Sequence, residues 1–262
     1  MFIHPTPFSD VNALLDELLS GVQNILEDNF VGLYLYGSLA SGDFDLERSD
    51  VDFVVVTRDK ISSEKISVLK AMHERLANSK LELATKLEGS YIPRADLRRY
   101  NQTDVEYPTL NERKFYLASH GSDWIIQRHV LREQGVTVAG LPPRDFIDVV
   151  ETKDLRRAVI GILNEWWLPM LENPAWLESG EYQAYAVLTM CRALFTIGNG
   201  TIASKPVSAR WAQETLGKRW KDLIEKAAAW RHCEQFNKLG ETLDFIRYTV
   251  DTANRSVRDD LK

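Results

Sequence analysis

Apolar residues recur at helical spacing over residues 9–28 and predict an amphipathic helix. Two short apolar runs follow at 31–36 and 51–56, each long enough for one buried strand. A second helix is expected over 62–80, with His73 at its surface or at an interface. The run 87–92, which stops at Pro93, predicts a further strand. These elements indicate a small mixed sheet with helices packed on it.

After residue 150 no segment has the pattern of a strand, and apolar residues recur at helical spacing instead. Gly140 followed by Pro142 and Pro143 breaks any regular element, so we expect a domain junction nearby. The fold class predicted is α+β, with domain 1–148 built on the sheet and domain 149–262 an all-α helical bundle. The tryptophans on the helical stripes are expected in its core. The helices of the second domain are predicted at 152–171, 181–197, 206–216, 219–231 and 234–256, and those tryptophans are Trp166, Trp167, Trp211, Trp220 and Trp230.

Composition narrows the class of protein. The chain has 262 residues, 44% hydrophobic and 27% charged, with a net charge of −6, as expected of a soluble globular protein. A negative balance argues against a nucleic-acid-binding surface and favours a small, cationic partner. Cys191 and Cys233 are expected to stay reduced. No signal peptide or membrane-spanning run is recognised, so we expect a cytoplasmic monomer that contacts neither nucleic acid nor membrane.

Candidate chemistry lies where the first two strands meet. Asp50 and Asp52 are two apart on a strand, so their carboxylates point to the same face. Such a pair suits Mg²⁺, which binds a few carboxylates together with phosphate oxygens. Gly37 and Ser38 follow the preceding strand, and a glycine there lets the backbone approach a phosphate closely. The pattern predicts metal-assisted attack on a nucleoside triphosphate.

The Gly-Ser turn followed by Asp-x-Asp on the next strand resembles the signature of the DNA polymerase β nucleotidyltransferase superfamily. With the helical half included, nearly the whole chain resembles the aminoglycoside adenylyltransferases of the 3″/9 type, which modify streptomycin and spectinomycin and confer antibiotic resistance. The segments that carry this resemblance are 36–38, 49–52, 87–88, 131–136, 187–192, 200–205 and 209–212.

The resemblance implies a Mg²⁺-dependent enzyme that transfers AMP from ATP to a hydroxyl of a small-molecule acceptor and releases pyrophosphate. Asp50 and Asp52 would hold Mg²⁺, Gly37 and Ser38 would contact phosphates, and Glu88 would be the general base. Arg192 and Lys205 of the helical domain would reach the nucleotide, which places ATP between the domains. The residues that would contact the acceptor are Trp124 and Glu178.

Several alternatives stay open at this point. Glu82 competes with Glu88 as the base, because residues six apart share a face of one long strand. Family members carry acidic residues before the helix that contains Arg192, whereas Tyr182 stands at one of those positions here. The acceptor could therefore be an aminoglycoside antibiotic, a different metabolite or a protein side chain. A nucleotide-binding regulator without catalysis is the alternative outside the enzymes.

Overall fold

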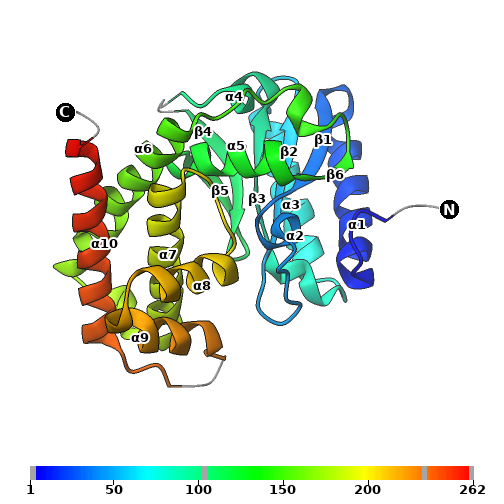
Figure 1. The fold of residues 1–262 in the computed structure, drawn as a ribbon. Coiled ribbons are helices and arrows are strands. Elements are labelled where there is room, and N and C mark those ends of the chain that lie inside the picture. Colours follow the sequence, from blue (N-terminus) through cyan, green and yellow to red (C-terminus); the bar gives the residue numbers. More distant parts are fainter. Residues whose placement is uncertain (1–3, 102–104, 232–234, 260–262) are drawn as a thin grey trace. The chain divides into compact units, whose positions relative to one another are not determined.

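The structure is a computed structural model that describes residues 4–101, 105–231 and 235–259. The chain divides into two compact units, residues 1–149 and residues 150–262. The sequence places the junction between residues 148 and 149. Each unit has its own set of elements (Figure 1). Cys233 lies outside the described residues, whereas Cys191 is buried and free.

A six-stranded mixed sheet forms the centre of the first unit, in the order β5-β4-β3-β2-β1-β6. Strands β2 and β3 are parallel, whereas β1–β2, β1–β6, β3–β4 and β4–β5 pair antiparallel. The mixed sheet expected from the sequence is therefore confirmed, with more strands than the sequence indicated. The strands are β1 (Phe30–Leu35), β2 (Val51–Thr57), β3 (Leu87–Pro93), β4 (Glu106–Asn111), β5 (Lys114–Ser119) and β6 (Val136–Ala139).

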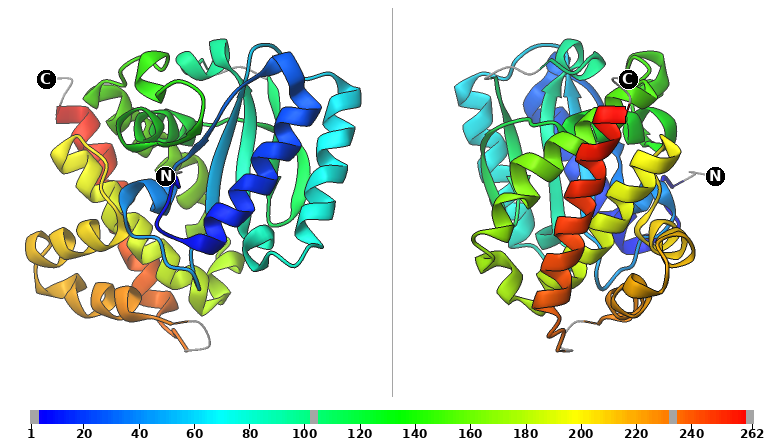
Figure 2. Two further views of the ribbon diagram at one scale, coloured as in Figure 1. Left: turned by 90° about the vertical axis from the view of Figure 1, so that its right-hand side faces the viewer. Right: turned by 60° about the vertical axis from the view of Figure 1, so that its left-hand side comes forward.

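The two faces of this sheet differ in what they carry. One face packs against α1 (Ser9–Leu26) and α3 (Ser63–Ala77), which contact each other (Figure 2, left). Their apolar stripes enclose alternate strand residues in one core. Residues one position along each strand point to the opposite face, where the candidate chemistry lies. The strand residues in the core include Leu33, Leu35, Val51, Phe53, Val55, Leu87 and Tyr91.

His73 belongs to this core, and the expectation that it lies at a surface or interface is wrong. It is 3% exposed, and its Nε2 lies 2.6 Å from the Tyr91 hydroxyl oxygen. Phe53 and Phe115 stack near its ring. Burial lowers the pKa of His73 to about 3, so the ring is neutral inside the core.

Residues 94–146 form helices and strands that the hydrophobic pattern did not predict, and a short helix also follows β1. Short helices α2 (Gly37–Ser41) and α4 (Arg94–Arg98) follow β1 and β3, and α5 (Asp123–Gln134) packs against α2. The β4–β5 hairpin turns at Glu112 and Arg113, which both have positive φ. Arg98 and Arg99 both form salt bridges with Asp148 in the same unit.

The second unit is helical, as predicted. Helix α7 contacts α6, α8, α9 and α10, and Figure 1 shows it beside α10. Gly200 has a φ of 70° and ends α7 after Asn199, two residues beyond the predicted end at residue 197. No helix of the described residues is long and apolar enough to cross a membrane. The helices are α6 (Thr152–Ile162), α7 (Gly180–Asn199), α8 (Lys205–Thr215), α9 (Lys218–Ala229) and α10 (Leu239–Asp259).

The helix expected over 152–171 is interrupted. After α6 the chain makes a π turn, Leu163–Trp167, and then a 3-10 turn, Pro169–Leu171. Trp167 is 2% exposed and belongs to the core, but Trp166 is 49% exposed. The prediction that Trp166 is a core residue is therefore wrong, because the π turn shifts the helical stripe.

Candidate active site

The candidate carboxylates meet at one end of the parallel strand pair. Asp52 is the register partner of Glu88 across β2 and β3, so the two residues are neighbours on the same face. Asp50, directly before β2, is exposed, whereas Asp52 and Glu88 are half-buried. The face is the one that α1 and α3 leave uncovered. Glu82 is exposed at the start of a 3-10 turn, Glu82–Lys86, and is not part of the strand.

Gly37 follows β1 and lies against Asp52. The Tyr36 backbone N–H donates to the Asp52 carbonyl oxygen at 3.1 Å, which ties the end of β1 to β2. Gly37 has a φ of +61°, and a Cβ built there would collide with the Asp52 carboxylate. The turn therefore needs glycine for its backbone conformation and for the space that Asp52 occupies. Ser38, in the first turn of α2, is half-buried beside it.

Burial and neighbouring carboxylates raise the pKa values of Glu88 and Tyr36. The pKa of Glu88 is raised to about 7, first by burial and then by the charge of Asp50. The pKa of the Tyr36 hydroxyl is raised well above its usual value by burial and by the charges of Asp52, Glu88 and Asp123. A carboxylate with a pKa near 7 is suited to accept a proton at neutral pH.

An open pocket of about 250 Å³ borders Glu88 in the first unit. Its wall is formed by the start of β3, the β4–β5 hairpin and the start of α5. Ser90, two residues after Glu88 on β3, exchanges a hydrogen bond with Thr109 across the strands at 3.0 Å. The lining residues are Tyr36, Glu88, Gly89, Ser90, Thr109, Leu110, Asn111, Tyr116, Ala118, Ser119, His120 and Trp124.

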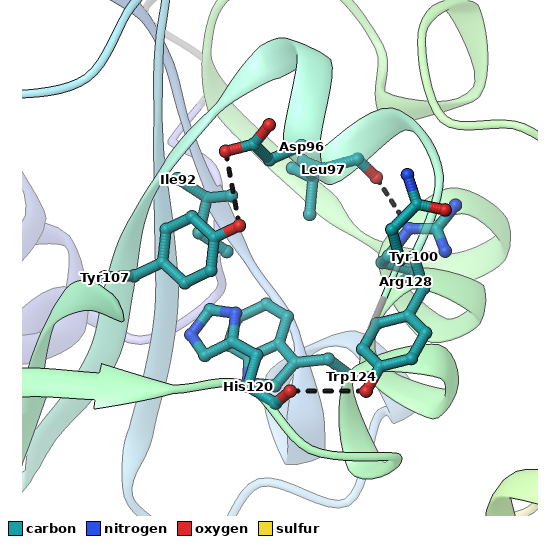
Figure 3. A pocket seen from close by; sticks show the side chains of 9 residues that line it. Ile92, Asp96, Leu97, Tyr100, Tyr107, His120, Trp124 and Arg128 are labelled. Carbon is teal, nitrogen blue, oxygen red and sulfur yellow. Dashed lines mark hydrogen bonds between the residues drawn. The ribbon is translucent and has the colours of Figure 1, made fainter. Parts of the chain in front are cut away.

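Trp124 is held in a stack of rings at the edge of this pocket. Its ring lies 3.8 Å from the His120 ring with 10° between the planes, and Tyr107 packs on His120 at 4.4 Å (Figure 3). Burial lowers the pKa of His120 to about 3, so the stacked imidazole is neutral. Trp124 is 8% exposed and also borders a smaller cavity lined by Asp96 and Arg128. The stack fixes the indole plane beside the larger pocket.

The donor set at the end of β2 fits a magnesium ion. Asp50 and Asp52 supply hard carboxylate oxygens, which Mg²⁺ binds together with phosphate oxygens. The charge of Asp50 acts on Glu88 and that of Asp52 on Tyr36, so both carboxylates face the same region. Among the residues that the structure describes, no group of three or more His, Cys, Asp or Glu side chains is arranged to hold a metal.

The other candidate residues lie in the second unit. Arg192 is half-buried on α7, and Lys205 is the first residue of α8. The Lys205 Nζ lies 5.3 Å from the centroid of the Tyr185 ring. Glu178 ends an exposed 3-10 turn, Ala175–Glu178, and Tyr182 follows in the first turn of α7.

The structure thus brings together Gly37, Asp52, Glu88 and, at the pocket rim, Trp124. Sequence reasoning did not single out Ser90, Thr109 or His120 as lining residues. Ser90 could have been found, because it shares the strand face of Glu88. Thr109 and His120 gave no such signal, since the hairpin that places them was not predicted.

Comparison with known proteins agrees with this geometry. Residues 17–112 match the family described as "Nucleotidyltransferase domain", and residues 145–255 match "Aminoglycoside adenylyltransferase, C-terminal domain". An aminoglycoside (3″)(9) adenylyltransferase of Shigella flexneri is 26% identical over 84% of each chain. A spectinomycin 9-adenylyltransferase of Campylobacter jejuni is 21% identical over 81% of this chain and 82% of its own.

A solved structure has the same fold. The spectinomycin adenyltransferase from Enterococcus faecialis, crystallised with ATP and spectinomycin, superposes with a TM-score of 0.72. The superposition covers 91% of this chain and 98% of that one at 17% identity. The α+β architecture expected from the sequence is therefore confirmed.

This protein is an enzyme of the nucleotidyltransferase class. The assignment rests on the match of residues 17–112 to the nucleotidyltransferase domain, and the Gly-Ser turn, the paired aspartates and the mixed sheet agree with it. Its helical unit and its relatives narrow the class further. The chain resembles the aminoglycoside adenylyltransferase family.

Proposed function

We propose that this enzyme transfers AMP from ATP to a hydroxyl group of an aminoglycoside or spectinomycin-type antibiotic and releases pyrophosphate. The observation that carries the proposal is the register of Asp52 and Glu88 on the sheet face opposite α1 and α3. It sets a candidate base beside a candidate metal ligand, at the mouth of a pocket of about 250 Å³. The antibiotic is taken from the names of the relatives.

In the proposed reaction the acceptor hydroxyl oxygen attacks the α-phosphorus of ATP, and the bond to the bridging oxygen of pyrophosphate breaks. Glu88 accepts the hydroxyl proton, because its pKa of about 7 leaves it partly ionised and sufficiently basic at neutral pH. Asp50 and Asp52 hold Mg²⁺, which neutralises phosphate charge when bound. The Gly37 turn gives the triphosphate close access to the backbone.

The pocket beside Glu88 is proposed to receive the part of the acceptor that carries the reacting hydroxyl. Trp124 presents an indole fixed by its stack with His120, and Ser90 and Thr109 offer hydroxyls that can bond to a polar acceptor. Arg192 and Lys205 are proposed to contact the nucleotide and Glu178 the acceptor; these roles rest on the resemblance to the adenylyltransferases.

The test is a pyrophosphate-release assay with ATP, Mg²⁺ and a panel containing streptomycin and spectinomycin, with mass spectrometry of the product. A gain of one AMP on one of these antibiotics is expected. Asp50→Asn and Asp52→Asn should each raise the Mg²⁺ concentration needed for half-maximal rate and lower the rate by at least about 100-fold. A protein that is folded and binds ATP, yet modifies no antibiotic on the panel, would contradict the proposed acceptor class.

A further inference from the structure

The turn of the β4–β5 hairpin has a strained backbone. Glu112 has a φ of 46° and Arg113 a φ of 65°, in the left-handed region that glycine adopts easily and other residues rarely. A two-residue hairpin turn of this kind needs positive φ at both central positions, and Asn-Gly or Asp-Gly is the usual sequence. Here a glutamate and an arginine adopt it instead, which costs conformational energy. Strained residues persist where the surrounding structure fixes them, and they occur often at functional sites.

The two strands of the hairpin hold this turn in place. Leu110 on β4 and Phe115 on β5 are register partners, one pair before the turn, and both pack with the core of the first unit. Leu110 is buried, and the Phe115 ring stacks on the His73 ring with 5.3 Å between centroids. The turn therefore cannot shift along the strands unless side chains in the core move with it.

The pairing of β4 with β3 brings the turn to the candidate base. Ser90 on β3 is the register partner of Thr109 on β4, and their hydroxyl oxygens lie 3.0 Å apart. Because the strands are antiparallel, the position before the turn, Asn111, comes opposite Glu88 when this register is continued. Asn111 and Glu88 both line the pocket of about 250 Å³. The turn thus begins directly beside Glu88.

The Glu88 carboxylate accepts a hydrogen bond from the Glu112 backbone N–H. The ladder between β4 and β5 ends at the pair of Asn111 and Lys114, so this N–H lies beyond the last ladder pair. Burial has the largest effect on the pKa of Glu88 and raises it, whereas this hydrogen bond lowers it, because it stabilises the ionised carboxylate. A carboxylate has several lone pairs, so Glu88 can hold this bond and still accept a proton from a substrate.

We propose that the hairpin turn at Glu112 and Arg113 is a positioning element for the candidate base, and that the Glu112 N–H fixes the direction in which the Glu88 carboxylate faces the pocket. The inference rests on the proposed role of Glu88 in proton transfer. Glu112 is a positioning residue, since it acts through Glu88. A glutamate side chain has several rotatable bonds, and a donor on a fixed backbone limits the orientations of its carboxylate. Relaxation of Glu112 to negative φ would turn its peptide plane and take the N–H away from Glu88.

The contact is tested without ATP or antibiotic, by NMR measurement of hydrogen exchange at the Glu112 N–H. Glu88→Ala should speed this exchange at least about tenfold, because the N–H loses its acceptor. Glu82→Ala is the matched control, since Glu82 is exposed in the turn before β3, and it should leave the exchange rate unchanged. Equal exchange rates in the two variants, whether fast or slow, would overturn the proposal.

The kinetic test compares Glu112→Val with Glu27→Val. Glu27, directly after α1, is also a glutamate with positive φ, of 51°, and valine is strained in that region at either position. Glu112→Val should lower kcat at least about tenfold and change the KM for ATP by less than about twofold, because a misplaced base affects the transition state and not nucleotide binding. Glu27→Val should keep the wild-type kcat. Equal kcat values in the two variants would overturn the positioning role.

A conservative change of the turn should rescue the rate. Glu112→Asn combined with Arg113→Gly keeps the N–H and favours positive φ at both positions, so its kcat should exceed that of Glu112→Val at least about fivefold. If Glu112→Val does not fold, insertion of two glycines between Glu112 and Arg113 lengthens the turn, leaves both strands intact and should cause the same loss. A double variant as slow as Glu112→Val would contradict the role of the backbone.

These outcomes separate the inference from the proposed function. Faster exchange at Glu112 in Glu88→Ala, in an enzyme that modifies no antibiotic, would refute the proposed acceptor and keep the contact. Antibiotic modification with the same kcat in Glu112→Val and Glu27→Val would keep the proposed function and refute the positioning role.

Discussion

The Asp52 carboxylate occupies the space in which a side chain at Gly37 would begin. Gly37→Ala should therefore displace Asp52 and lower kcat/KM by at least about 100-fold, since displacements near 1 Å have effects of that size. Steady-state kinetics and circular dichroism would check the variant. Gly42→Ala is the matched control, because Gly42 also has a positive φ, of +80°, but no atom within 4 Å of the added Cβ. Equal losses of activity in both variants would mean that backbone strain, not Asp52, is responsible.

Removal of the carboxylate at Glu88 should abolish transfer and spare ATP binding. Glu88→Gln keeps the shape of the side chain but cannot accept a proton, so kcat should fall by roughly 10²–10⁴-fold. In the wild type kcat/KM should rise with pH as Glu88 ionises, at a pH above the ordinary carboxyl range because burial raises its pKa. Glu82→Gln, in the exposed turn before β3, is the control. A Glu88→Gln enzyme with the wild-type rate and pH profile would move the base elsewhere.

The same residue should make stability depend on pH. The pKa of Glu88 is about 7 in the folded protein, above the ordinary 4.5, so the unfolded state loses this proton first as pH rises. The stability it contributes is present below pH 4.5 and is lost as pH rises to about 7. Without divalent cations, Glu88→Gln should therefore be more stable than the wild type above pH 7, by about 1–2 kcal/mol after screening by solvent. Urea unfolding at pH 4.5 and pH 8 measures the difference, and a difference that does not change between them would contradict it.

The buried pair of His73 and Tyr91 stabilises the other face of the sheet. Tyr91→Phe removes a 2.6 Å hydrogen bond and leaves the His73 Nε2 without that partner in the core. The free energy of unfolding should fall by about 1–3 kcal/mol. Urea denaturation checks this, with Tyr116→Phe, 44% exposed, as the control. An unfolding free energy unchanged in Tyr91→Phe would show that the bond contributes no net stability.

Sequence reasoning succeeded where periodicity was strong and local. It identified β1, β2, β3 and α1, because their apolar patterns face a single core. It missed the β4–β5 hairpin, because β5 is largely exposed and the turn at Glu112 and Arg113 lacks the glycine that marks such turns.

Only the site residues that form short sequence motifs could be predicted from the sequence. Asp50 and Asp52 stand out from spacing alone, and the choice of Glu88 over Glu82 needed the start of β3 at Leu87. The pocket wall depends on tertiary pairing of the hairpin, which no local pattern encodes. The exposure of Trp166 depends on the π turn at Leu163–Trp167, which a search for helical periodicity does not detect.

Parallel pairing of β2 and β3 has a consequence for how this enzyme can change. The alignment of Asp52 with Glu88 is set by main-chain hydrogen bonds, and a slip of one residue would turn Glu88 into the core. Side chains around the pocket can therefore be exchanged while the distance between the two carboxylates is kept. Such a site can acquire a new acceptor through substitutions in its walls, and its reaction chemistry need not be rebuilt.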